Sequence, residues 1–113
     1  MKEIQETVSI QFVKGESEKG HPEIRMFRDL DGKKGKAVYK FFTPKTITLE
    51  NFKSIKKMYL IDKEGELLTK KIDLYISGNY IKEVTSTYSW YSEKEFERFM
   101  RFSKRYANSL TNN

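Results

Sequence analysis

The sequence has no cysteine and a single histidine, His21. Without cysteine the chain forms no disulfide, has no cysteine nucleophile and cannot bind zinc or an iron–sulfur cluster through thiolates. His21 stands beside Pro22 in a stretch rich in glycine and charge, where an exposed loop residue is expected rather than a general base. We therefore expect no catalytic residue, no metal site and no cofactor, so the protein is not expected to be an enzyme.

Apolar residues are also scarce, at 37% of the chain, and no apolar run approaches the roughly 18 residues of a membrane span. The first residues contain no apolar stretch that could serve as a signal peptide. Aromatic residues are plentiful at 14%, which argues against disorder and predicts a small aromatic core. The length of 113 residues predicts one domain spanning 1–113, with an ordered core over about 7–110.

Positive charge dominates, with 22 Lys and Arg against 16 Asp and Glu and a net charge of +6 at pH 7. This balance favours an acidic partner: nucleic acid, anionic lipid headgroups or an acidic protein surface. Composition does not choose among them.

Alternation of apolar and polar residues predicts strands in the first half of the chain. They lie at 7–13, 23–29 and 37–42, and the turn formers at 29–35 predict a hairpin between the second and third. The residues between 14 and 22 are typical of a loop, and 47–49 is expected to be a short strand.

In the second half, strands are predicted at 57–61, 67–76 and 80–88. Turn sequences at 62–66 and 77–79 separate them, so the three strands are expected to form a meander. The segment 93–110 is predicted to be a helix because Ser92 and Glu95 form a capping box before an apolar face. The expected fold is α+β: an antiparallel sheet of five to six strands with one C-terminal helix packed against it.

Basic residues are spaced by four, three and four along this helix. We expect this stripe to lie opposite the apolar face, where arginine suits carboxylate or phosphate recognition, although a solvated face is the simpler interpretation. The stripe consists of Lys94, Arg98, Arg101 and Arg105. Phe102, outside the main apolar cluster, is expected at the rim of the core.

Three other patterns have a functional and a simpler interpretation. Asp62, Glu64 and Glu66 could bind a cation weakly but lack the spacing of a calcium loop, so a solvated hairpin tip is expected. The GKKG at 32–35 resembles a phosphate clamp, which in RNA-binding modules lies between helices rather than strands. Strand aromatics could stack bases, although such residues are usually core; they are Tyr39, Phe41, Phe42, Tyr59 and Tyr75.

Long strings in the sequence resemble one family. They are IQFVKG at 10–15, PEIR at 22–25, DG at 31–32, GKAVYKFF at 35–42 with Pro44, MYLIDKEGE at 58–66, and RFMRF at 98–102 followed by RYA at 105–107. In this order they resemble the Psb28 family of small photosystem II assembly proteins of cyanobacteria and plastids. The sequence departs from the family at Lys57, Phe96 and Ser103, which indicates a divergent copy, plastid-encoded or a second paralogue.

The resemblance implies a non-enzymatic assembly or repair factor with an antiparallel sheet and a helix. Such a factor would bind photosystem II assembly intermediates transiently, at the reaction-centre core and the larger inner chlorophyll-binding antenna. It would be peripheral to the thylakoid membrane, on the cytosolic or stromal side. The family's sheet is thought to receive extended partner segments, so we expect strand addition at an open sheet edge.

Charge is expected to steer this docking toward acidic surface. The expected binding residues are Arg25, Arg28, Lys94, Arg98, Arg101 and Arg105. No nucleic acid is expected as a partner under this interpretation. The alternative is a small basic RNA-binding module that uses the strand aromatics with lysine and arginine.

Overall fold

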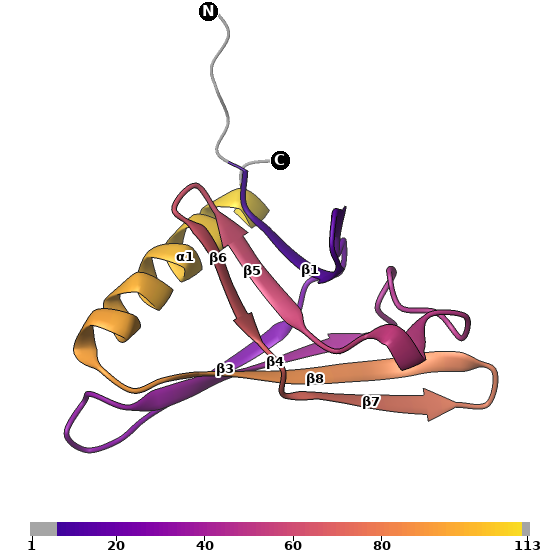
Figure 1. The fold of residues 1–113 in the computed structure, drawn as a ribbon, viewed down its shortest axis with the longest axis horizontal. Helices are drawn as coiled ribbons and strands as arrows, with labels where there is room; N and C mark the ends of the chain where they lie inside the picture. The colour runs from indigo at the N-terminus through magenta and orange to yellow at the C-terminus, as the bar shows by residue number, and fades with distance from the viewer. Residues whose placement is uncertain (1–6, 112–113) are drawn as a thin grey trace, which may run out of the picture.

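The computed structural model describes residues 7–111, which contain two four-stranded antiparallel sheets and one long helix (Figure 1). The first sheet has the strand order β2-β1-β5-β6 and the second has the order β3-β4-β8-β7. In chain order the elements are β1 (Ser9–Val13), β2 (Glu16–Ser17), β3 (Glu23–Arg28), β4 (Gly35–Phe42), the 3-10 turn η1 (Phe52–Ser54), β5 (Met58–Asp62), β6 (Gly65–Thr69), β7 (Ile72–Ser77), β8 (Tyr80–Trp90) and α1 (Glu93–Thr111). The α+β class and the C-terminal helix are confirmed, but the strands number more than expected and are divided between two sheets.

The second sheet is built on its two central strands. β4 and β8 pair along the whole of β4, from Gly35 opposite Trp90 to Phe42 opposite Glu83. Alternate residues of β4 point inward, and Ala37, Tyr39 and Phe41 are buried there. The first sheet and α1 both lie on this inner side (Figure 1), so the opposite face of the second sheet is left uncovered.

Aromatic contacts hold the three layers together. The rings of Phe12 in the first sheet and Phe41 in the second meet edge to face, with centroids 5.3 Å apart. Phe99 of α1 stacks on Tyr88 and Trp90 of β8, at 5.4 and 5.1 Å. The small apolar fraction of the sequence is therefore concentrated in large aromatic side chains, each of which buries much surface.

The helix begins as its capping sequence predicts. The N–H of Glu95 donates to Ser92 Oγ at 3.1 Å, and Ser92 Oγ lies 3.3 Å from Glu95 Oε2. Its fully buried residues are Phe99, Phe102 and Tyr106, so Phe102 lies in the core rather than at its rim as expected. Capping depends on neighbouring residues alone, whereas the rotation of a helix is set by the surface on which it packs.

The predicted meander is wrong. Residues 67–76 form two strands in different sheets, because the chain leaves the first sheet after Thr69 and enters the second at Ile72. Thr69 Oγ1 donates to Thr87 O at 2.6 Å and accepts from the N–H of Lys71 at 3.1 Å, which fixes this crossing against β8. A hydroxyl that bonds backbone locally offers the chain an alternative to continuing a strand.

The predicted strand at 47–49 is also wrong. Thr48 and Asn51 bond to each other in both directions, at 2.8 and 3.2 Å, and this turn leads into η1. Ile47 is buried as an anchor in the core. Nearby, the buried Glu18 accepts from the N–H groups of Lys45 and Thr46 at 2.8 and 3.1 Å, which ties the loop after β2 to this segment.

Candidate docking site

One edge strand of the second sheet is β3, which pairs with β4 on one side and has no neighbour on the other side among the strands that the structure describes. The ladder between them is regular from Glu23 opposite Lys40 to Arg28 opposite Gly35. Since the N–H of Asp29 donates to Lys34 O at 2.9 Å, the alternation of an antiparallel ladder assigns odd-numbered residues of β3 to bonds with β4. Ile24, Met26 and Arg28 then direct their N–H groups to the open edge.

The structure places Arg25 and Arg28 on opposite faces of this strand. Arg25 pairs with Val38 on the uncovered face and is exposed. Arg28 points inward, where its guanidinium lies 3.9 Å from the ring centroid of Phe96 and donates to Gly32 O at 2.6 Å. Arg28 thus connects the β3–β4 hairpin to the first turn of α1.

The sequence predicted a stripe of basic side chains opposite the apolar face of the helix. The structure shows instead that its three arginines are bound within the molecule. They point to the β5–β6 hairpin, where Arg98 binds Asp62 through two bonds of 2.9 and 2.8 Å. Arg101 binds Glu64 through two bonds of 2.8 and 2.9 Å, and Arg105 donates to both carboxylates. We call these five residues the hairpin clamp. Lys94, the fourth member of the predicted stripe, is exposed in the first turn.

The clamp sets the charge state of its carboxyl groups. Arg101 and Arg105 donate to Glu64 and lower its pKa to about 2. Burial of Asp62 acts in the opposite direction, but the bonds from Arg98 and Arg105 outweigh it and hold the pKa of this carboxyl below its usual value. Asp62 was predicted to be solvated; the missed signal is that it continues the inward register of Met58 and Leu60.

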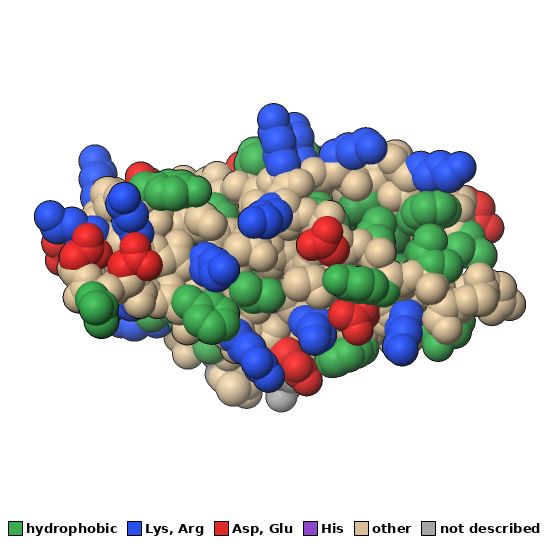
Figure 2. Space-filling view, turned by 90° about the horizontal axis from the view of Figure 1, so that it is seen from below, with side chains coloured by type: hydrophobic (Ala, Val, Ile, Leu, Met, Phe, Trp, Pro, Cys, Tyr) green, Lys and Arg blue, Asp and Glu red, His purple; other side chains and the backbone are tan. Residues whose placement is uncertain are grey.

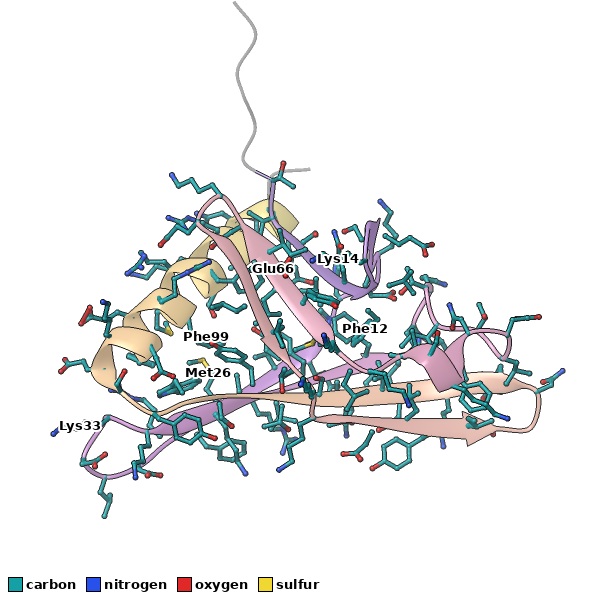
Figure 3. All side chains as sticks on the ribbon, in the orientation of Figure 1. Phe12, Lys14, Met26, Lys33, Glu66 and Phe99 are labelled. Carbon is teal, nitrogen blue, oxygen red and sulfur yellow. The ribbon has the colours of Figure 1, made fainter. Side chains whose placement is uncertain are left out.

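The third acidic residue of the 62–66 turn, Glu66, lies 2.9 Å from Lys14 Nζ, and Figure 3 labels both residues. Each acidic residue of this turn is therefore bound to a cation of the chain itself.

His21 is exposed, as expected of a loop residue. Within residues 7–111 no helix has both the length and the apolar character needed to cross a membrane.

The aromatic residues do not form the base-stacking platform of the alternative interpretation. Tyr39 and Phe41 are buried in the core and Tyr59 is half-buried, which leaves Phe42 and Tyr75 exposed. The GKKG at 32–35 spans the end of the β3–β4 turn and the start of β4, between two strands, as its context indicates.

Sequence reasoning missed the uncovered face of the second sheet. Side chains there alternate with the buried ones, and Figure 2 shows hydrophobic groups interspersed with basic and acidic ones across this side of the molecule. The sequence of β4 already indicated this face, because the residues that alternate with the buried ones are both basic and apolar. They are Lys36, Val38, Lys40 and Phe42.

Comparison with known proteins shows the family of this chain. The family model described as "Psb28 protein" matches residues 10–111. A "Photosystem II reaction center Psb28 protein" of Prochlorococcus marinus (strain NATL2A) is 70% identical over 113 residues, covering 100% of both chains. A protein of the same name from Synechococcus sp. (strain CC9902) is 39% identical over 109 residues, covering 96% of this chain and 83% of the relative. The chain belongs to the Psb28 family.

Proposed function

We propose that this protein is a non-enzymatic assembly or repair factor of photosystem II. The observation that carries the proposal is its similarity over its whole length to the Prochlorococcus protein named for the photosystem II reaction centre. It binds assembly intermediates transiently on the cytosolic side of the thylakoid membrane, or on the stromal side in a plastid. Its partners are the reaction-centre core and the larger inner chlorophyll-binding antenna.

Strand addition at β3 is the proposed binding mode. An extended tail gains affinity by pairing its backbone with an open sheet edge, and it needs no sharp side-chain motif. β3 suits this role because it is six residues long, regular in its pairing with β4, and free of proline. Ile24 and Met26 are each 42% exposed on its inner side, and an added strand would cover them.

The other edges fit an incoming strand less well. β7, on the far side of the same sheet, has an irregular register between Tyr75 and Ile76, and irregularity of this kind discourages strand pairing. β2 is only two residues long. β6 runs directly into the crossing segment that Thr69 fixes on β8.

Charge contributes in two ways. Exposed Arg25, beside the open edge, and exposed Lys94 would steer an acidic partner toward the protein. Arg28 holds the hairpin that contains β3 against α1. Arg98, Arg101 and Arg105 act at the binding site indirectly, because their ion pairs hold α1 to the β5–β6 hairpin.

The test is recovery of photosystem II intermediates from solubilised thylakoids by the tagged protein. Met26→Pro removes an N–H that faces the open edge and leaves the bonds to β4 intact, so it should abolish recovery. Leu74→Pro is the matched change on β7, because Thr87 N–H donates to Lys71 O and the ladder alternation then frees the N–H of Leu74. This variant should still recover the complex.

Circular dichroism and thermal melting verify that both variants fold. Loss of recovery with Leu74→Pro alone would move the binding edge to β7. Recovery by both variants would exclude strand addition at either edge. Failure of the unmodified protein to recover any photosystem II subunit would overturn the proposed function itself.

A further inference from the structure

The uncovered face of the second sheet carries a patch with its own chemistry. On β4 the outward side chains alternate between basic and apolar, and on β3 the outward side chains are Glu23, Arg25 and Phe27. We call the basic and apolar members of this set the basic–aromatic strip. Phe27 and Phe42 are each 50% exposed on it. The strip consists of Arg25, Phe27, Lys36, Val38, Lys40 and Phe42.

Cations and rings are interleaved within the strip. Lys36 Nζ lies 5.6 Å from the ring centroid of Phe27, and Lys40 Nζ lies 5.9 Å from that of Phe42. Three acidic side chains share this face: Glu23 opposite Lys40, Glu83 opposite Phe42, and Asp73 on β7. On β3 and β4 themselves three cations and one acid accompany three apolar groups, while Glu83 and Asp73 lie on the β8 and β7 side. An occupant centred on β3 and β4 is therefore anionic and offers apolar contact as well.

We propose that the basic–aromatic strip docks on an anionic lipid surface. Lysine and arginine beside exposed aromatic rings are the pattern of proteins that lie in a membrane interface, where cations meet headgroups and rings enter the acyl boundary.

Two other occupants fit less well. A second copy of the chain would bring a second set of the same three cations into one desolvated interface, where like charges repel. Single-stranded nucleic acid would need rings close enough for successive bases to stack. Lys36, the partner of Phe27, precedes Phe42 by six residues on β4, so the two rings lie about 20 Å apart at the rise of a strand.

The strip and the β3 edge can be used at the same time. A strand added at the edge extends the sheet in its own plane, while the strip faces perpendicular to that plane. Lipid contact through the strip would therefore hold the open edge beside the membrane surface, where the tails of a membrane complex emerge. This inference goes beyond the proposed function, because lipid binding needs no partner protein.

The test is co-sedimentation with vesicles of phosphatidylcholine alone, or of phosphatidylcholine and phosphatidylglycerol in a two-to-one ratio. The protein should bind only the anionic vesicles, and binding should weaken as salt rises. One basic residue near an anionic surface strengthens binding about fivefold. The double variant Lys36→Glu/Lys40→Glu should therefore weaken binding by about 25-fold or more.

A matched control separates the strip from overall charge. Lys56→Glu/Lys104→Glu changes the net charge equally, but Lys56 lies between η1 and β5 and Lys104 is exposed on α1. This control should retain most of the vesicle binding. Equal loss in both double variants would show diffuse attraction and overturn the proposal.

A second measurement reports the apolar contact. In the Phe27→Trp variant, the new indole should shift its emission to the blue on anionic vesicles and be quenched by brominated acyl chains. The unmodified protein is the control, because its single tryptophan, Trp90, is fully buried. Absence of quenching would overturn insertion of the strip, and so would vesicle-independent dimerisation that Phe27→Ser/Phe42→Ser abolishes. Retained photosystem II binding without vesicle binding would assign the strip to protein docking instead.

Discussion

Gly35 is the residue whose missing side chain matters most for this fold. It begins β4, opposite Arg28 of β3 and Trp90 of β8. A Cβ at this position would overlap the carbonyl oxygen of Phe27 and approach the Trp90 ring to 2.5 Å. The glycine is needed here because of close approach and not because of a special backbone angle.

Gly35→Ala is expected to destabilise the protein by about 1–3 kcal/mol, because a buried ring and a strand must move apart. Chemical unfolding followed by circular dichroism measures the change. Gly20→Ala is the matched control, since its Cβ would meet only ordinary contacts, the nearest at 3.5 Å. An equal effect at both positions would contradict the steric explanation.

Among the elements, the contact between α1 and the β5–β6 hairpin depends most on charge. Asp62 is a buried carboxylate with bidentate Arg98 and a further bond from Arg105. Burying a charge is costly unless it is paired, so this contact is stable only while both partners are ionised. The clamp therefore adds a charge-dependent contact to the aromatic packing that joins α1 to the core.

The clamp predicts a loss of stability in acid. The pKa values of Asp62 and Glu64 are lower in the folded chain than in the unfolded one, so the unfolded state binds more protons as the pH falls. Their contribution is present above about pH 5 and is lost as the pH falls through about 4 toward 2. Urea unfolding across this range should show the decline.

The variant Glu64→Gln should make the acid decline of the unfolding free energy shallower, since one of the titrating groups is removed. Glu50→Gln, an exposed change in the loop before η1, is the control and should leave the slope as it is. Identical slopes for all three proteins would mean that the clamp does not contribute to acid stability.

At the scale of the whole molecule, the two sheets share one core. Buried residues of β1, β4, β5, β8 and α1 form a single cluster, and Phe12 reaches Phe41 across the space between the sheets. The rings of Trp90 and Phe99 join α1 to the same cluster. Neither sheet has a core of its own, so they should unfold together.

Phe12→Ala should lower stability by about 3–5 kcal/mol, as is typical for a buried phenylalanine. The midpoints reported by Trp90 fluorescence and by far-ultraviolet circular dichroism should fall together, although Trp90 lies in the other sheet. A Trp90 midpoint that stays in place while the circular dichroism splits into two transitions would show that the sheets unfold separately.

Local pattern was sufficient for many features. Alternation located β1, β3, β4, β5 and β8, the turn formers located three hairpins, and the Ser92–Glu95 pair located the start of α1. These features depend on residues that are close in the chain. The family was also recognisable from contiguous strings, and the family model match at 10–111 confirms it.

Only the tertiary structure decided which sheet each strand joins, how α1 is rotated, and what the helix arginines bind. Arg98 and Arg105 are 36 and 43 residues from Asp62 in the chain. Periodicity shows that residues share a face, but it does not show which element that face meets. Which element a face meets depends on packing between segments that are distant in the chain. This packing binds the helix arginines to the β5–β6 hairpin, and it leaves the outward side chains of β4 without a covering layer.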